Sequence, residues 1–297
     1  MKRLFFTFAF ILLLCSTAQA RTITDDSGRT VTFDKPFTRI ISLYGAHTEN
    51  LFSLGLDEQI IGVSTGEDYP AAALAKPTFN ARDGVEKFLA AKPDLILIRP
   101  MHMRAYGGLW NALERHGVTV VSLQPDSVEA MFGYWRTLGA LTGRQMKAEY
   151  MIEDFRDGVR RAEARLSTIP MEERPGVFFE SIHRKTATFS PGAMPLFVLE
   201  KAGGINVAAD ARPRHGTNIA DYGLERLLAK GDKVDVYLAQ RGTMNDVSVH
   251  DIVSSPPASR IKAVLTRNVY LVDEHLVSRP TLRLLEGIDT VYQLLHP

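Results

Sequence analysis

VEKFLAAK, at residues 85–92, is followed by the apolar run LILI at 95–98, and a similar stretch returns as LERLLAK at 224–230 followed by VDVYL at 234–238. Each copy is typical of a short amphipathic helix that carries a glutamate in its first turn, Glu86 or Glu225, and leads into a buried strand. A helix–strand unit that is used twice predicts two similar lobes. It therefore favours a two-lobed binding protein over an enzyme with a single cavity. Such units also occur singly in many α/β folds, so the repeat alone leaves that simpler interpretation open.

The N-terminus has the features of an export signal. Lys2 and Arg3 form a basic start, residues 4–14 are almost entirely apolar, and the sequence AQA at 18–20 fits a small-x-small cleavage site. Because a span of the bilayer takes about 20 apolar residues, we predict a cleaved signal peptide at residues 1–20 and a periplasmic mature chain. The alternative is a lipoprotein anchored at Cys15, which the bulky Leu14 before it disfavours.

The composition excludes several classes of protein. Loss of the signal peptide would remove the only cysteine, so the mature chain must rely on a hydrophobic core rather than on disulfides. Without Lys2 and Arg3, 33 of the 35 basic residues remain against 34 acidic ones. This near-neutral balance gives no basic excess for nucleic-acid binding. We expect a monomer that binds neither nucleic acid nor a resident cofactor.

Strands and helices alternate along most of the chain. A β-hairpin is predicted at 22–33, around the turn DDSG. Beyond Arg39 the alternation indicates parallel strands connected by helices. Strands are expected at 40–43, 60–63, 95–98, 118–123, 177–180, 234–239 and 269–272. Helices are expected at 48–54, 85–91, 109–116, 127–141, 196–202, 222–229 and 279–295.

The longest helical pattern runs from about residue 144 to 167. Apolar residues recur through it at helical spacing, namely Met146, Tyr150, Ile152, Phe155, Val159, Ala162 and Leu166. We interpret residues 143–169 as a rigid connecting helix between an N-terminal lobe, 21–142, and a C-terminal lobe, 170–297. The predicted fold class is α/β, with two Rossmann-like lobes of mostly parallel sheet. The alternative is a core helix inside one large sheet.

Basic and aromatic residues collect where strands are expected to end. Ligands of open parallel sheets bind beyond the carboxyl ends of the strands. Arginine suits carboxylate, phosphate or catecholate oxygens, so two basic loop sets across a cleft would attract an anionic ligand. The simpler interpretation is that each arginine pairs with a local carboxylate. The candidate ligand-binding residues are Tyr44, His47, Arg99, His102, Tyr106, His183, Arg241, His275 and Arg279.

The sequence gives little support for a bare metal site or for catalysis. The histidines lie on separate loops and lack the close spacing of zinc ligands, so we predict no metal site. The alternative is direct coordination of a metal by histidines that folding brings together, as in a metal chaperone. The sequence GVSTG at 62–66 matches the nucleophile elbow of hydrolases, but a turn-like EDYP follows where that motif needs a helix. A secreted serine hydrolase using Ser64 is therefore the less favoured alternative, and we predict that the protein is not an enzyme.

Short segments spread over almost all of the expected mature chain match one known family in order and spacing. They are DDSGRTV (25–31), RIISL (39–43), TE (48–49), LGL (54–56), IGVS (61–64), DYP (68–70), KPDLI (92–96), LEKAGG (199–204) and the stretch around Glu225. On these segments the chain resembles the periplasmic substrate-binding proteins of ABC importers for ferric siderophores, haem and cobalamin. Those proteins have two lobes that are joined by a rigid helix.

The resemblance implies a docking role for two glutamates. Glu86 and Glu225 fall where members of the family place the carboxylates that dock onto arginines of the membrane permease. From the residues alone, each would simply be a favourable charge in the first turn of a helix. The resemblance therefore predicts the transmembrane subunits of an ABC permease as the partner.

The resemblance also bears on the ligand. Arg99, Arg241 and Arg279 fall in loops that line the ligand cleft of relatives. Gly66, Asn80 and Arg99 stand where the cobalamin-binding member has aromatic rings, which weakens a cobalamin interpretation. We predict an anionic iron chelate, a ferric siderophore of the catecholate or carboxylate type. The same fold carrying cobalamin, haem or an oxyanion such as molybdate is the alternative.

Overall fold

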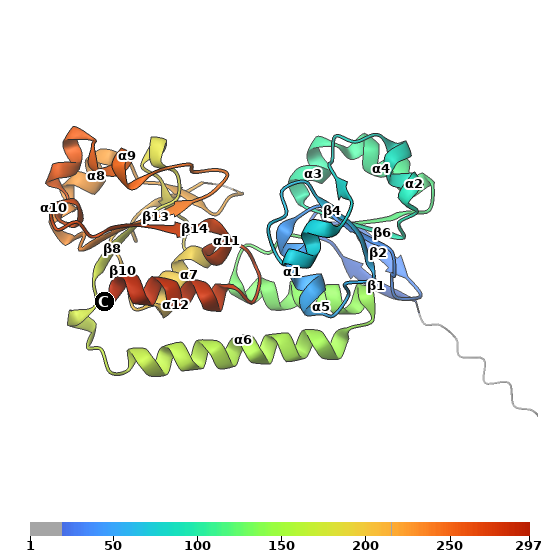
Figure 1. Cartoon of the computed structure of the whole chain (residues 1–297), viewed down its shortest axis with the longest axis horizontal. Coiled ribbons are helices and arrows are strands. Elements are labelled where there is room, and N and C mark those ends of the chain that lie inside the picture. The colour runs from blue at the N-terminus through green and yellow to red at the C-terminus, as the bar shows by residue number, and fades with distance from the viewer. Residues whose placement is uncertain (1–19, 215) are drawn as a thin grey trace, which may run out of the picture.

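The computed structural model describes residues 20–214 and 216–297 and shows two lobes side by side, with one long helix running beneath both (Figure 1). The basic start and the apolar run of the predicted signal peptide lie outside the described residues, as does Cys15. No helix in the described ranges combines the length and the apolar character needed to cross a membrane.

The N-terminal lobe is built on a parallel sheet. An antiparallel hairpin, β1 (Arg21–Thr24) and β2 (Thr30–Phe33), precedes it as expected. In the described chain the sheet has five strands, in the order β5 (Thr78–Phe79), β4 (Ile60–Ser64), β3 (Ile40–Ser42), β6 (Leu95–Ile98) and β7 (Thr119–Ser122). The helices of this lobe are α1 (Gly45–Ser53), α2 (Val85–Ala91), α3 (Pro100–Ala105), α4 (Gly107–Arg115) and α5 (Val128–Thr142), with a 3-10 turn at Ala71–Ala75.

The C-terminal lobe repeats this plan on a smaller scale. Its parallel sheet has the order β10 (Ile205–Asn206), β8 (Gly176–Glu180), β13 (Val236–Arg241) and β14 (Val269–Asp273). A small antiparallel sheet lies beside it, in the order β11 (Arg212–Pro213), β12 (Ile219–Asp221) and β9 (Thr188–Phe189). The helices are α7 (Met194–Lys201), α8 (Leu224–Ala229), α9 (Val249–Val253), α10 (Lys262–Leu265), α11 (Glu274–Val277) and α12 (Leu284–Leu295).

The repeated helix–strand unit occupies the same place in both sheets. Helix α2 leads into β6, which lies between β3 and β7, and α8 leads into β13, which lies between β8 and β14. All of these pairings are parallel. The prediction of two similar α/β lobes is therefore confirmed, and the alternative of one large sheet is wrong.

Helix α6 (Gln145–Leu166) lies where the connecting helix was expected and spans both lobes (Figure 1). Ile152, Phe155 and Ala162 are buried. The prediction that Met146 and Tyr150 share this apolar face is wrong, because their side chains are 65% and 60% exposed. These two residues are four apart and project together, but from the side of the helix that faces solvent. The exact divisions at 142/143 and 169/170 remain predictions.

Aromatic packing joins the lobes through α6. The ring of Phe155 lies 5.8 Å from Trp135 of α5 and 6.1 Å from Phe197 of α7, measured between ring centroids. These residues belong to a hydrophobic cluster that extends from the N-terminal sheet to α12. Because close-packed interiors deform little, this arrangement favours small rocking movements over a wide hinge opening.

Two boundaries predicted from sequence are wrong in ways that affect the site. The helix expected at 279–295 begins only at Leu284, because residues 278–283 form an irregular segment that contacts the N-terminal lobe. The carbonyl of Pro280 accepts hydrogen bonds from Asn50 Nδ2 (2.9 Å) and Trp135 Nε1 (3.2 Å). A residue before proline is also disfavoured in a helix. The loop expected after β6 is instead the short helix α3, with Pro100 at its first position.

Candidate functional site

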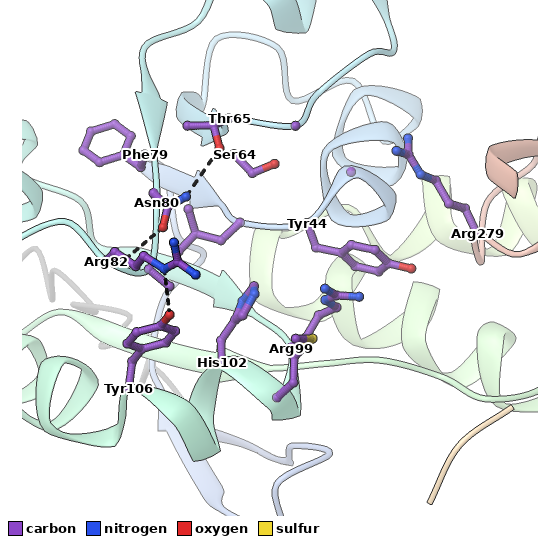
Figure 2. Close-up of a pocket in the computed structure, with 15 residues that line it drawn as sticks. Tyr44, Ser64, Thr65, Phe79, Asn80, Arg82, Arg99, His102, Tyr106 and Arg279 are labelled. Atoms are coloured by element: carbon purple, nitrogen blue, oxygen red, sulfur yellow. Dashed lines mark hydrogen bonds between the residues drawn. The ribbon is translucent and has the colours of Figure 1, made fainter. Parts of the chain in front are cut away.

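A cavity of about 440 Å³ lies at the carboxyl end of the N-terminal sheet (Figure 2). Loops after β3, β4, β5 and β6 contribute most of its wall, and one residue, Arg279, comes from the C-terminal lobe. Among the described residues that line this cavity, none is an aspartate or a glutamate. The lining residues are Leu43, Tyr44, Gly45, Ser64, Thr65, Gly66, Phe79, Asn80, Ala81, Arg82, Arg99, Met101, His102, Tyr106 and Arg279.

Arg99 and Tyr44 form the centre of this wall. The guanidinium carbon of Arg99 lies over the Tyr44 ring, 4.6 Å from its centroid, and Figure 2 shows the two side chains side by side in the cavity. The Nε atom of Arg99 is buried and has no hydrogen-bond partner within the described chain. The aromatic face attracts the cation without neutralising its charge. Arg99 therefore keeps donors available for an anionic ligand.

Arg82 is a cavity residue that the sequence analysis missed. Its Nε donates to the Tyr106 hydroxyl at 3.2 Å, and its backbone N–H donates to Asn80 Oδ1 at 2.9 Å (Figure 2). Asn80 Nδ2 in turn donates to Thr65 Oγ1 at 3.4 Å. Arg82 follows β5, whose two residues are too few to give a strand pattern. Recognition of that strand would have placed Arg82 among the strand-exit candidates.

His102 lies on α3 and lines the cavity as a neutral imidazole. Burial, assisted by the positive charge of Arg99, lowers its pKa to about 4. Its Nδ1 is buried and unpaired in the part of the chain that the structure describes. The backbone carbonyl of His102 accepts a hydrogen bond from Trp110 Nε1 at 2.8 Å. This places an indole directly behind the cavity wall.

His47 does not reach the cavity. It is fully buried on α1, with Nδ1 2.7 Å from the Tyr134 hydroxyl and Nε2 3.2 Å from the carbonyl of Ile98. Burial, together with the charge of Arg99, lowers its pKa to about 3 despite the bond to Ile98. The ring packs edge-on against Tyr44 at 5.1 Å. His47 thus supports the cavity wall from beneath.

Arg241 and His183 lie apart from this cavity. Arg241, at the end of β13, lines a second cavity of about 430 Å³ with Gly242, Leu271, Val272 and Asp273. His183 Nδ1 lies 3.0 Å from Glu180 Oε2, and this hydrogen bond raises the pKa of His183. The buried Glu180 also accepts a hydrogen bond from the Tyr237 hydroxyl.

Arg279 lines the first cavity, but two carboxylates of the opposite lobe already neutralise it. Its Nη1 lies 2.7 Å from Glu49 Oε1 and 2.6 Å from Asp68 Oδ1. His275 pairs with Asp68 through Nδ1 and does not line the cavity. The structure thus brings together Tyr44, Arg99, His102, Tyr106 and Arg279 of the predicted site, and leaves out His47, His183, Arg241 and His275.

Ser64 is not arranged as a nucleophile. It is the last residue of β4, and its hydroxyl donates to Glu67 Oε1 at 2.7 Å. Residues 65–70 contain no helix, whereas the nucleophile elbow requires one directly after its serine. Over residues 20–214 and 216–297, no group of three or more His, Cys, Asp or Glu side chains is placed to hold a metal ion.

Glu86 and Glu225 occupy matching positions on the two lobes. Each is exposed and is the second residue of its helix, α2 or α8. These helices lie on different lobes, both on the side of the molecule away from α6 (Figure 1). The arrangement places one glutamate-bearing helix of each lobe on the same side.

Two similar lobes joined by a helix, with a polar cavity where strands end, define a two-lobed binding protein. The chain belongs to the periplasmic binding protein family, whose model matches residues 40–276. The resemblance to substrate-binding proteins of ABC importers is thereby confirmed. Proteins of that class deliver a ligand to a membrane permease.

Individual relatives agree with this assignment. The uncharacterized ABC transporter substrate-binding lipoprotein YvrC of Bacillus subtilis (strain 168) is 26% identical over 279 residues, which is 93% of this chain and 85% of the relative. The vitamin B12-binding protein of Vibrio parahaemolyticus is 23% identical over 260 residues, 87% and 89% of the two chains. A possible iron-binding (periplasmic solute-binding) protein from Staphylococcus epidermidis superposes with a TM-score of 0.75 at 26% identity, covering 89% of this chain and all of the other.

Proposed function

We propose that this protein binds an anionic metal chelate, a ferric siderophore of the catecholate or carboxylate type, and delivers it to an ABC permease without catalysis. The observation that carries the proposal is the charge of the cavity. Three arginines line it, and no carboxylate of the described chain does. Since Glu49 and Asp68 neutralise Arg279, the attraction for an anion rests on Arg82 and Arg99.

The geometry of these two arginines suits a multiply charged oxygen-rich ligand. Arg99 is held by the Tyr44 ring and Arg82 by the Tyr106 hydroxyl. Both guanidinium groups are therefore partly ordered before a ligand arrives, which lowers the entropy that binding costs. Catecholate and carboxylate oxygens accept the paired N–H donors of arginine. Neutral His102 adds a nitrogen that can hydrogen-bond the ligand or approach its metal.

Cobalamin is the second candidate, because relatives of this chain are named as vitamin B12-binding proteins. Three observations count against it. Gly66, Asn80 and Arg99 all line the cavity, and these are the positions where the family resemblance places aromatic rings in a cobalamin binder. A flat corrin gains most from aromatic faces, whereas Asn80 and Arg99 offer polar groups that it would leave unpaired.

The remaining parts of the proposal concern export and docking. Residues 1–20 act as a cleaved signal that sends a monomer to the periplasm, where its partner permease is accessible. Glu86 and Glu225 dock onto that permease, one carboxylate from each lobe. Their exposure and their matching places on α2 and α8 support this role.

A fluorescence titration tests the proposed ligand class. Trp110 lies behind His102, so a light-absorbing ligand in the cavity should quench the indole. The panel contains a ferric tris-catecholate, ferric citrate, a ferric trihydroxamate, haemin and cyanocobalamin, and binding of the non-absorbing molybdate is measured by calorimetry. We expect saturable one-to-one quenching by a catecholate or citrate complex at micromolar concentration or below, and weaker binding of the others. Tighter binding of cyanocobalamin or haemin than of every anionic iron complex would contradict the proposal.

A further inference from the structure

An ion-pair cluster connects the two lobes beside the cavity. Arg279 lies in the segment between α11 and α12, and its Nη1 contacts Glu49 Oε1 of α1 at 2.7 Å and Asp68 Oδ1 of the loop after β4 at 2.6 Å. Both carboxylates belong to the opposite lobe. The cluster therefore spans the gap between lobes at a point where Arg279 also forms part of the cavity wall.

Burial makes the inner part of this cluster hard to separate. Glu49 is 3% exposed and Arg279 is 9% exposed. Burial raises the pKa of the Glu49 carboxyl, while the hydrogen bond and charge of Arg279 oppose this shift. Removing one partner of a buried pair leaves an uncompensated charge in a poorly solvated place. Movement of the lobes that withdrew Arg279 from Glu49 would create the same situation.

The N-terminal lobe is shaped to receive the guanidinium. A Cβ on Gly45, the first residue of α1, would lie 2.8 Å from both Cζ and Nη1 of Arg279. Such a distance is inside van der Waals contact, so a side chain at position 45 would displace the guanidinium from its place. The neighbouring carbonyl of Pro280 accepts hydrogen bonds from Asn50 and Trp135 of the same lobe. Backbone and side chain of the segment are thus both fixed.

An outer layer surrounds this pair. His275 of α11 contacts Asp68, and the Arg283 guanidinium lies over the Tyr69 ring, 4.4 Å from its centroid. Arg283 Nη1 also lies 3.8 Å from Glu49 Oε1. These three contacts each join a C-terminal residue to the N-terminal lobe.

We propose that Glu49, Asp68 and Gly45 are positioning residues that clamp Arg279 and so fix the separation of the two lobes. Arg279 then acts as a fixed edge of the cavity rather than as a donor for the ligand. The clamp sets the width of the gap that a ligand must fit, whatever its chemistry. It adds an electrostatic restraint at the cavity to the packing of Phe155 on α6.

Distances between spin labels on the two lobes test the clamp. Labels are attached at Ala90→Cys on α2 and Val249→Cys on α9, both exposed positions, in a chain with Cys15→Ser. Pulsed dipolar spectroscopy then compares this parent with Glu49→Gln, Asp68→Asn and Gly45→Ala. The matched control is Glu149→Gln, which removes an exposed ion pair to Arg136 on the surface of α5 and α6.

We expect a narrow distance distribution in the parent and the control, and a distribution at least twice as wide or shifted in each clamp variant. Asp68 is partly exposed, so Asp68→Asn should fold even if Glu49→Gln does not. A distribution in folded Asp68→Asn and Gly45→Ala that matches the parent would overturn the proposal. Clamp variants that lose thermal stability but keep the parent distances between labels would show that these residues only stabilise the fold. This result would also overturn the proposal.

Discussion

The guanidinium of Arg99 lies over the ring of Tyr44, 4.6 Å from its centroid, on a cavity wall to which the described residues contribute no carboxylate. A cation–π contact of this kind contributes about 0.5–2 kcal/mol, depending on how far it is desolvated. It orients the guanidinium and leaves its charge available. The Tyr44 ring thus holds the Arg99 guanidinium in place, and no carboxylate of the described cavity wall neutralises its charge. Recognition of an anionic chelate requires both properties.

Removal of Arg99 should weaken binding of the anionic chelate. A charge-assisted hydrogen bond contributes about 1.5–3 kcal/mol, so Arg99→Ala should raise the dissociation constant about 10- to 100-fold. The quenching titration measures this change. Arg104→Ala is the matched control, because Arg104 is exposed on α3, the helix that Arg99 directly precedes, and does not line the cavity. Equal losses in the two variants would mean that only long-range attraction is at work.

Tyr44 should contribute through its ring rather than its hydroxyl. Tyr44→Phe keeps the aromatic face beneath Arg99 and should leave the dissociation constant within about threefold of the parent. Tyr44→Leu removes the face and should raise it about 3- to 30-fold, from the range of cation–π energies. The same titration compares both variants. If Phe proves as harmful as Leu, the hydroxyl contacts the ligand and the ring argument is wrong.

Buried His47 should make the fold sensitive to acid. Its pKa of about 3 lies below the usual 6.5, so between these values the unfolded state binds a proton that the folded state does not. Stability contributed by neutral His47 is therefore present above pH 6.5 and is lost as the pH falls. Linkage gives a loss of about 2 kcal/mol in the free energy of unfolding between pH 7 and pH 5.

Urea unfolding at both pH values measures this loss, with His47→Gln as the comparison. Gln cannot titrate, so the variant should lose about 2 kcal/mol less than the parent, even though it is less stable at pH 7. His102, whose pKa is about 4, stays in both proteins and cancels. The same drop in parent and variant would show that His47 does not govern the acid response.

The two exposed glutamates should matter for transport and not for binding. Glu86→Lys combined with Glu225→Lys reverses both proposed docking charges and should abolish uptake of the chelate by cells, while the titration stays unchanged. Glu172→Lys combined with Glu173→Lys, both on an exposed turn after α6, controls for the same change in net charge. If uptake survives the double substitution, the two glutamates do not dock onto the permease and only stabilise the first turns of their helices.

Local patterns were enough to predict the fold. The repeated unit, the strand–helix alternation and α6 all show in the periodicity of neighbouring residues. Helix α2 was predicted with the bounds that the structure has, Val85–Ala91. The apolar face of α6 was predicted less well, since Met146 and Tyr150 differ from Phe155 only in the direction in which they project.

The site was harder to predict, because it depends on contacts between distant parts of the chain. Strand-exit logic found Tyr44, Arg99 and His102. It could not reveal that Arg279 pairs with Glu49 and Asp68, more than 200 positions away in sequence. Position after a strand also could not distinguish buried His47 from the cavity residue Tyr44, since both residues follow β3. Arg82 was missed because β5 is only two residues long.

The central claim is that the cargo is an anionic iron chelate, and the protein's own cargo tests it most directly. The protein is isolated from its source organism under iron limitation and analysed by native mass spectrometry, with metal content measured in parallel. The account predicts one small molecule per chain, carrying one iron atom and rich in catecholate or carboxylate groups. A corrinoid, a haem or an oxyanion in its place would contradict the account.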